Sequence, residues 1–157
     1  MRLSSRQART SDDAFVSAIY FETQRELIER LFGWRGDAEE RARFAKHYDR
    51  ANTRILRVDG RDAGWWTVRR GPDIALDAIY LAPAFQNRGI GTALLGRLIA
   101  EGKASELAVR LSTAKLNRAR GLYERLGFTV VHDDEYKVYM KLPPPRGRLK
   151  RARSTKP

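Results

Sequence analysis

Residues suited to holding a phosphate gather just before a predicted helix. The first amides of a helix have no intrahelical partner, and the helix dipole favours an anion beside them. Glycines lack a Cβ atom and let a phosphate approach the backbone, while an arginine adds a charge-assisted donor. The segment therefore predicts a pyrophosphate-binding loop; its residues are Gln86, Asn87, Arg88, Gly89, Ile90, Gly91 and Thr92.

A strand before this loop and a helix after it are predicted to position it. Ile79 and Leu81 close a mostly apolar run that is typical of a buried strand. Pro83 ends that strand because it lacks a backbone donor. Ile90 and Leu94, spaced by four, begin the apolar face of the helix.

A strand leading into a glycine-started helix is also typical of a tight turn that binds nothing. The segment lacks the Gly-Lys-Ser/Thr ending of a P-loop and the third glycine of the dinucleotide fingerprint. It instead resembles the Gln/Arg-x-x-Gly-x-Gly/Ala motif of the GNAT acetyltransferase superfamily, which cradles the pyrophosphate of acetyl-coenzyme A. The resemblance implies that the loop and the adjacent strand residues Ile79 and Leu81 bind this donor.

A second segment, beginning at Asn117 and ending at Gly127-Phe128, resembles another family motif. There an Asn shortly precedes Ala-x-x-x-Tyr-x-x-x-Gly-Phe, and Tyr123 stands at the Tyr position. The resemblance implies that Asn117 contacts the pantetheine arm or its neighbourhood and that Tyr123 lies near the cofactor sulfur as general acid. Without the first motif, the segment could equally be an amphipathic helix that ends at a glycine.

The composition narrows the classes of protein that remain. The 157 residues include no cysteine, which excludes disulfides and a thiol nucleophile, and only two widely separated histidines, so no metal site is expected. No apolar run reaches about 18 residues, and the N-terminus lacks the apolar core of a signal peptide. We therefore expect a cytoplasmic protein without membrane contact.

The positive charge is unevenly distributed. The chain carries a net charge of +12, and residues 146–157 supply half of it with six basic and no acidic residues. The segment has almost no apolar residues, so we expect residues 143–157 to form a disordered basic tail. Since no nucleic-acid reader motif is present, nucleic-acid contact is expected only as non-specific binding through this tail.

The order of expected elements is β-α-α-β-β-β-α-β-α-β-β. This α/β order, with a mixed central sheet of about six or seven strands flanked by four helices, matches the GNAT fold, and residues 1–142 are expected to form one domain. Strands are expected at 3–9, 53–58, 63–69, 74–81, 107–111, 128–131 and 136–142, and helices at 10–33, from 37, at 90–102 and at 117–126.

Local signals mark several details of these elements. Thr10 and Asp13 have capping-box spacing at a helix start, and Asp59-Gly60 is typical of a hairpin turn. Because side chains alternate along a strand, one of Trp65 and Trp66 is expected to face the core and the other the opposite side. The basic residues around the second helix are expected to form its solvated face; they are Arg41, Arg43, Lys46 and Arg50.

Amine acetylation needs a base and an acid. An alkyl ammonium has a pKa near 10, so deprotonating it at pH 7 costs about 4 kcal/mol. A carboxylate can take that proton, and the candidates are Asp77, on the strand before the loop, and Glu22, in the first helix. Each has an alternative role: Asp77 as a structural hydrogen-bond acceptor, Glu22 on an exposed helix face. An amide at the end of the strand is expected to stabilise the oxyanion, and Tyr123 to protonate the leaving thiolate.

The expected activity is transfer of an acetyl group from acetyl-coenzyme A to a primary amine. Because the chain has no cysteine, transfer should be direct, within a ternary complex. The alternative is a catalytically silent module that binds coenzyme A. The acceptor stays open, with a slight preference for small, neutral-to-acidic amines recognised by residues 20–24 and nearby loops. Family members are frequently dimers, which leaves a homodimer open.

Overall fold

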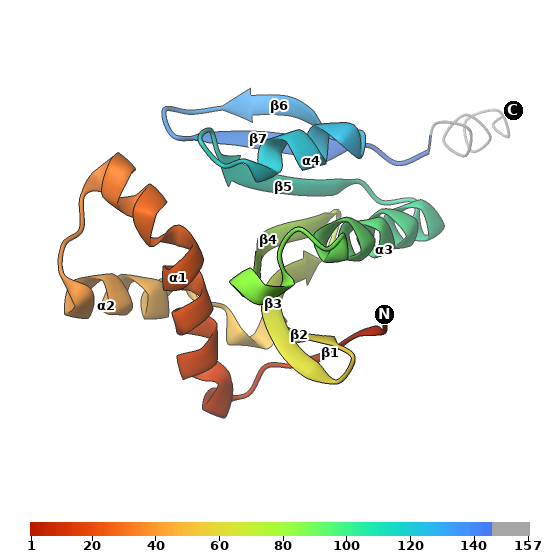
Figure 1. The fold of residues 1–157 in the computed structure, drawn as a ribbon. Coiled ribbons are helices and arrows are strands. Elements are labelled where there is room, and N and C mark those ends of the chain that lie inside the picture. Colours follow the sequence, from red (N-terminus) through yellow and green to blue (C-terminus); the bar gives the residue numbers. More distant parts are fainter. Residues whose placement is uncertain (146–157) are drawn as a thin grey trace, which may run out of the picture. The chain divides into compact units, whose positions relative to one another are not determined.

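The computed structural model describes residues 1–145, so most of the expected basic tail, residues 146–157, lies outside the described residues. The described chain contains seven strands and four α-helices, which confirms the predicted α/β fold class (Figure 1). It divides into two compact units. Residues 1–69 and 76–91 form the first unit, and residues 70–75 with those from 92 onward form the second.

Four strands of the first unit are hydrogen-bonded in the order β1-β2-β3-β4. The helices of this unit precede β2 along the chain, which agrees with the predicted order. The elements are β1 (Leu3–Gln7), η1 (Thr10–Asp12), α1 (Asp13–Phe32), α2 (Asp37–His47), η2 (Arg50–Asn52), β2 (Thr53–Val58), β3 (Arg61–Arg70), β4 (Ile74–Leu81) and η3 (Pro83–Phe85).

The predicted hairpin joins β2 and β3. Asp59 and Gly60 both have positive φ angles, of 50° and 80°, which is the backbone conformation that a two-residue hairpin turn requires. The two strands are antiparallel, and Thr53 lies opposite Thr67. The hydroxyl groups of these two threonines are 2.6 Å apart in the buried interior. The hairpin therefore places the end of β3 beside β2 with a defined register.

The core of the first unit forms where α1 packs on the sheet. Val16 and Ile19, one helical turn apart, are buried together with Trp65 of β3. The Trp65 indole donates a hydrogen bond of 3.0 Å to the Val16 carbonyl, so its polar group is satisfied inside the core. Trp66, which points to the other side of β3, is also buried. The sheet is thus covered on both faces at this position.

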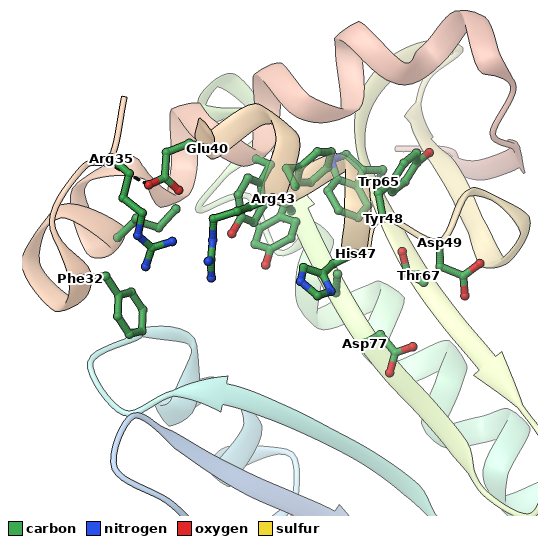
Figure 2. A pocket seen from close by; sticks show the side chains of 15 residues that line it. Phe32, Arg35, Glu40, Arg43, His47, Tyr48, Asp49, Trp65, Thr67 and Asp77 are labelled. Atoms are coloured by element: carbon green, nitrogen blue, oxygen red, sulfur yellow. Dashed lines mark hydrogen bonds between the residues drawn. The ribbon is translucent and has the colours of Figure 1, made fainter. Parts of the chain in front are cut away.

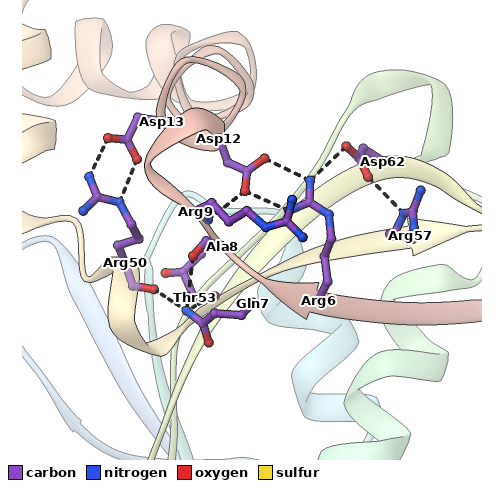
Figure 3. Close-up of polar contacts among 10 residues, drawn as sticks. All are labelled: Arg6, Gln7, Ala8, Arg9, Asp12, Asp13, Arg50, Thr53, Arg57 and Asp62. Carbon is purple, nitrogen blue, oxygen red and sulfur yellow. Dashed lines mark hydrogen bonds and ion pairs between the residues drawn. The ribbon is translucent and has the colours of Figure 1, made fainter.

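The start of α1 is fixed by an ionic network that differs from the predicted cap (Figure 3). Asp12, not Asp13, accepts a hydrogen bond of 2.8 Å from the Arg9 amide. Both oxygens of Asp12 also accept from the Arg6 guanidinium, each at 2.9 Å. Asp13 instead pairs with Arg50. Capping-box spacing therefore indicated the correct turn but the wrong carboxylate, because a guanidinium from β1 engages Asp12.

The second unit holds the remaining strands, in the order β5-β7-β6, with two helices. Both neighbouring strand pairs are antiparallel. Gly102, predicted to end α3, lies inside it. A Cβ atom there would be 2.9 Å from the Leu107 carbonyl oxygen, so the helix needs a glycine to approach this segment. The elements are α3 (Ile90–Ser105), β5 (Val109–Ala114), α4 (Ala119–Arg125), β6 (Thr129–Asp133) and β7 (Lys137–Leu142).

Replacing Asp12 by asparagine should lower the free energy of unfolding at neutral pH. It should also make this free energy less sensitive to acid. Hydrogen bonding to Arg6 is the largest of the causes that lower the pKa of Asp12 from 3.8 to about 2. A lowered folded-state pKa stabilises the protein above pH 3.8, and this stabilisation disappears as the pH falls through about 2. We expect Asp12→Asn to cost about 1–2 kcal/mol at pH 7, reduced by solvent screening of the pair.

Urea unfolding between pH 7 and pH 2 measures this effect. The difference between wild type and Asp12→Asn should shrink towards zero at the acid end. Glu135→Gln is the control, since this exposed carboxylate forms no ion pair within residues 1–145. A constant difference across the whole pH range would show that the Asp12 charge is not the stabilising feature.

Candidate active site

The predicted phosphate loop follows the end of β4 and leads into α3. The η3 turn comes between them, and its Phe85 side chain is buried. The Gln86 side-chain amide donates a hydrogen bond of 2.9 Å to the Leu81 carbonyl, which ties the loop back to the last residue of β4. Ile90 is 1% exposed and anchors the first turn of α3. The loop is thus held at both ends.

Between these anchors the backbone adopts a conformation that favours glycine. Asn87 and Gly89 have positive φ angles, of 58° and 76°. A Cβ atom at Gly89 would meet nothing within 4 Å, so the space beside this backbone is open. Five of the seven loop residues are solvent-exposed, namely those from Gln86 to Gly89 and Thr92. Open space beside a glycine, next to the unpaired amides of a helix start, fits a phosphate group.

A guanidinium completes the set of donors in the loop. The Arg88 guanidinium lies 5.5 Å from the centre of the Phe85 ring, and that of Arg61 lies at the same distance from it. Within residues 1–145, Arg88 pairs with no carboxylate, and its hydrogen bond to the Ala84 carbonyl is long, at 3.5 Å. Its charge therefore stays available to an anion. Loop amides, open glycine and cation together fit a diphosphate.

The end of β4 is shaped by a close approach of β3. A Cβ atom at Gly64 would lie 2.2 Å from the Tyr80 carbonyl oxygen, so only glycine fits there. Next along the chain, the Ala82 amide donates to the Ala63 carbonyl at 2.9 Å. Ile79 and Leu81 are half-buried. A backbone amide at the end of β4 that would donate to the oxyanion stays a prediction.

A pocket of about 290 Å³ opens in the first unit, between α1, α2 and the strands β3 and β4 (Figure 2). This volume is sufficient for a small molecule, since an apolar cavity of about 150 Å³ can already hold benzene. Its wall combines six aromatic rings with six ionisable groups. The lining residues are Tyr20, Ile28, Phe32, Arg35, Glu40, Arg43, Phe44, His47, Tyr48, Asp49, Trp65, Thr67, Asp77, Ala78 and Tyr80.

Five of the rings contact one another and form the apolar part of the wall. Phe44 and Tyr48, four residues apart, are stacked with ring centres 5.5 Å apart. Tyr20 lies 4.7 Å from Phe44. Tyr80 lies 5.0 Å from Trp65, which also faces Phe44 and Tyr48. These rings come from α1, α2 and its following residue, β3 and β4, so the pocket depends on all four segments.

The carboxylates of the pocket differ in their partners. Asp77 is held by Arg69, whose guanidinium donates to both carboxylate oxygens. Asp49 accepts from the Asn52 side chain at 2.7 Å. Glu40 is 5% exposed, and its described partner is the Arg35 backbone amide at 3.1 Å. Within residues 1–145, two of the three acids therefore have no paired cation.

Two arginines of the pocket lack an anionic partner. Within residues 1–145, the guanidinium groups of Arg35 and Arg43 form no ion pair, although several other arginines do. Burial and Glu40 raise the pKa of Tyr20, while Arg43 opposes this rise. The Glu40 and Arg43 charges are thus both felt at the Tyr20 phenol.

One predicted base lies at this pocket and the other does not line it. Asp77 lines the pocket, with its side chain 35% exposed. Glu22 is exposed on α1 and is not among the lining residues. Of the predicted acceptor region 20–24, Tyr20 lines the pocket. Of the two predicted bases, Asp77 is thus the one that lines the pocket.

Sequence reasoning missed the contributions of α2 to this pocket. Arg43 is solvent-exposed, as expected, and it also lines the pocket, whereas Arg50 lies beyond the helix and pairs with Asp13. Glu40, Phe44 and Tyr48 are spaced by four, and this spacing could have identified a polar residue on the apolar face.

The second unit contains the remaining predicted residues. The Asn117 side chain accepts a hydrogen bond of 2.9 Å from the Ala119 amide and so stabilises the start of α4. Tyr123 of α4 is buried, with its ring 6.2 Å from that of Phe128. Burial raises the pKa of the Tyr123 phenol above its ordinary value near 10.

Two further features of residues 1–145 concern metal binding and membrane spans. They contain no cluster of three or more His, Cys, Asp or Glu side chains that could hold a metal ion. No helix among them is both long and apolar enough to cross a membrane.

Comparison with known structures identifies proteins of similar fold. PaiA N-acetyltransferase from Thermoplasma acidophilum, in complex with coenzyme A, matches 91% of the chain and 99% of its own, with a TM-score of 0.70 and 16% identity. The ribosomal-protein-S18-alanine N-acetyltransferase from Escherichia coli matches 90% and 94%, with a TM-score of 0.61 and 23% identity. At such identities the likeness shows the fold alone.

The family is shown by the sequence itself. No curated protein matches the chain. The family model described as the acetyltransferase (GNAT) family matches residues 17–128, which include the phosphate loop, the pocket strands and the Asn117 to Tyr123 segment. The chain therefore belongs to the GNAT family of acetyltransferases.

Proposed function

We propose that the protein is an N-acetyltransferase that moves an acetyl group from acetyl-coenzyme A to a primary amine. The observation that carries the proposal is the open, glycine-containing turn at the start of α3, which lies within the matched family region. Its donors would bind the pyrophosphate of the donor substrate. The residues assigned to this role are Gln86, Asn87, Arg88, Gly89, Ile90, Gly91 and Thr92, with Ile79, Leu81 and Asn117 along the rest of the cofactor.

The acceptor amine would bind in the pocket of the first unit. Asp77 would take its proton, directly or through water, while Arg69 holds the carboxylate in a fixed orientation. The free amine attacks the thioester carbonyl, a C–N bond forms, and the C–S bond breaks as the oxyanion collapses. Tyr123 would give its proton to the departing thiolate. Because the chain has no cysteine, the acetyl group would pass directly to the amine.

Two measurements test the activity. Calorimetry with coenzyme A should detect binding, and release of free thiol from acetyl-coenzyme A should depend on an added amine. Binding without turnover across a broad amine panel would favour the silent cofactor-binding module instead. Absence of binding at millimolar coenzyme A would exclude both. A cytoplasmic location and a homodimer stay predictions from the sequence.

Gly89→Ala should weaken coenzyme A binding. Alanine at a φ of 76° is strained by about 1–2 kcal/mol, which corresponds to about a tenfold loss of affinity if the loop shifts to relieve it. Gly96→Ala is the control, because it adds the same methyl group inside α3 with nothing within 4 Å. Calorimetry compares the two. Equal affinities in Gly89→Ala and wild type would contradict a role for this turn in phosphate binding.

Tyr123→Phe should lower kcat by about 100-fold, the lower end of the range for losing a general acid, and leave coenzyme A affinity unchanged. The exposed Tyr139, whose hydroxyl donates to Asp134, supplies the control Tyr139→Phe. This control loses a phenol at the surface and should keep full activity. Steady-state kinetics with a saturating amine distinguishes them. Unchanged turnover in Tyr123→Phe would assign the proton to another donor.

A further inference from the structure

The pocket of the first unit is polarised along its length. In Figure 2, Arg35 and Arg43 extend towards one end of the lining, while Asp77 and Asp49 lie at the other. The five contacting rings described above also line the pocket, and Figure 2 labels Trp65 and Tyr48 among them. The pocket thus presents a cationic end, an acidic end and an apolar wall of rings.

The charges at the cationic end do not cancel. Arg35 and Arg43 carry two positive charges, and Glu40, which lines the same part of the pocket, carries one negative charge. Glu40 is buried, and its carboxylate accepts a hydrogen bond from the Arg35 backbone amide. Within residues 1–145, it forms no ion pair with the guanidinium group of Arg35 or Arg43. One net positive charge remains, on two planar forks suited to a carboxylate.

The charges at the opposite end favour a cation. The charge of Asp77 is balanced by Arg69, whose guanidinium donates to both carboxylate oxygens. The charge of Asp49 is not balanced in this way, because its described hydrogen bonds come from the backbone and side-chain amides of the neutral Asn52. The rings of the wall suit an apolar or aromatic body, and their faces attract an ammonium group. His47 lines the pocket as well.

Resting on the proposed function, we propose that the acceptor is a small zwitterionic amine with an apolar or aromatic body, that is, an amino acid or a close analogue. Its carboxylate binds Arg43 and Arg35, its body lies among the rings, and its amine reaches the end that holds Asp77. A polycation such as a polyamine would instead place positive charge against the two arginines. The pocket volume of about 290 Å³ accommodates one such molecule.

The test compares ligands that differ only in the carboxylate. Phenylalanine is paired with phenethylamine, and leucine with 3-methylbutylamine, with spermidine as the polycation. Calorimetry on the full-length protein, with and without coenzyme A, should show at least about tenfold tighter binding of the amino acid in one pair, the usual worth of a charge-assisted hydrogen bond. Binding of neither pair, equal binding within both pairs, or tighter binding of spermidine would overturn the proposal.

A charge-matched variant pair assigns the preference to the pocket. Arg43→Gln should remove the advantage of the amino acid over its amine and leave the amine's affinity unchanged. Arg41→Gln removes the same charge from α2 at a residue outside the pocket lining and should keep the advantage. An advantage that persists in Arg43→Gln would overturn the assignment. Circular dichroism and urea unfolding confirm that both variants fold.

The outcome is distinguishable from failure of the donor proposal. Coenzyme A binding with turnover of another amine, but without a carboxylate preference, would reject this inference alone. A carboxylate preference in a protein that does not bind coenzyme A would reject the donor proposal alone.

Discussion

The buried Trp65 indole determines how the first unit is assembled. A buried N–H group must find an acceptor, and this one reaches the Val16 carbonyl in α1. The contact ties α1 to β3, and the remaining rings of the cluster pack around the indole. Tyr48 brings a polar group into this region: burial raises its pKa, and its hydroxyl has no hydrogen-bond partner within residues 1–145. The rings of the pocket wall therefore pack in or against the hydrophobic core, and the shape of this part of the wall depends on that packing.

The role of each arginine in this protein depends on its position and its partners, not on the net charge of the chain. Most arginines with described partners stabilise the structure: Arg6 holds the start of α1, and Arg69 orients Asp77. Arg35, just before α2, and Arg43, on α2, differ because both line a pocket where no carboxylate of the described chain forms an ion pair with their guanidinium groups. A net charge of +12 does not distinguish these roles. The same cation stabilises the fold when paired and is free to recognise a ligand when unpaired.

Regular elements followed from local signals, whereas only some of their ends did. The boundaries of β2 and β4 were predicted correctly because apolar runs there end at turn residues. The helix α3 passes through Gly102 to Ser105, since that glycine serves a close approach to Leu107 rather than a helix end. The strand β5 begins later and runs further than its alternating residues predicted. Such differences arise because glycine and short polar residues have several uses, and only the neighbours decide among them.

The sequence by itself determined the fold class and the family resemblance, and it predicted the position of the phosphate loop. Each depends on residues close together in the chain, where glycine conformation, helix amides and apolar spacing are local properties. Only the tertiary structure decided which side chains share a pocket. Tyr20, Arg43, Trp65 and Asp77 come from four different elements, and the packing of α1 and α2 on β3 and β4 brings them together. It also made the solvent-exposed Arg43 part of the pocket lining, because the residues that share a pocket depend on long-range packing and not on the helix's own sequence.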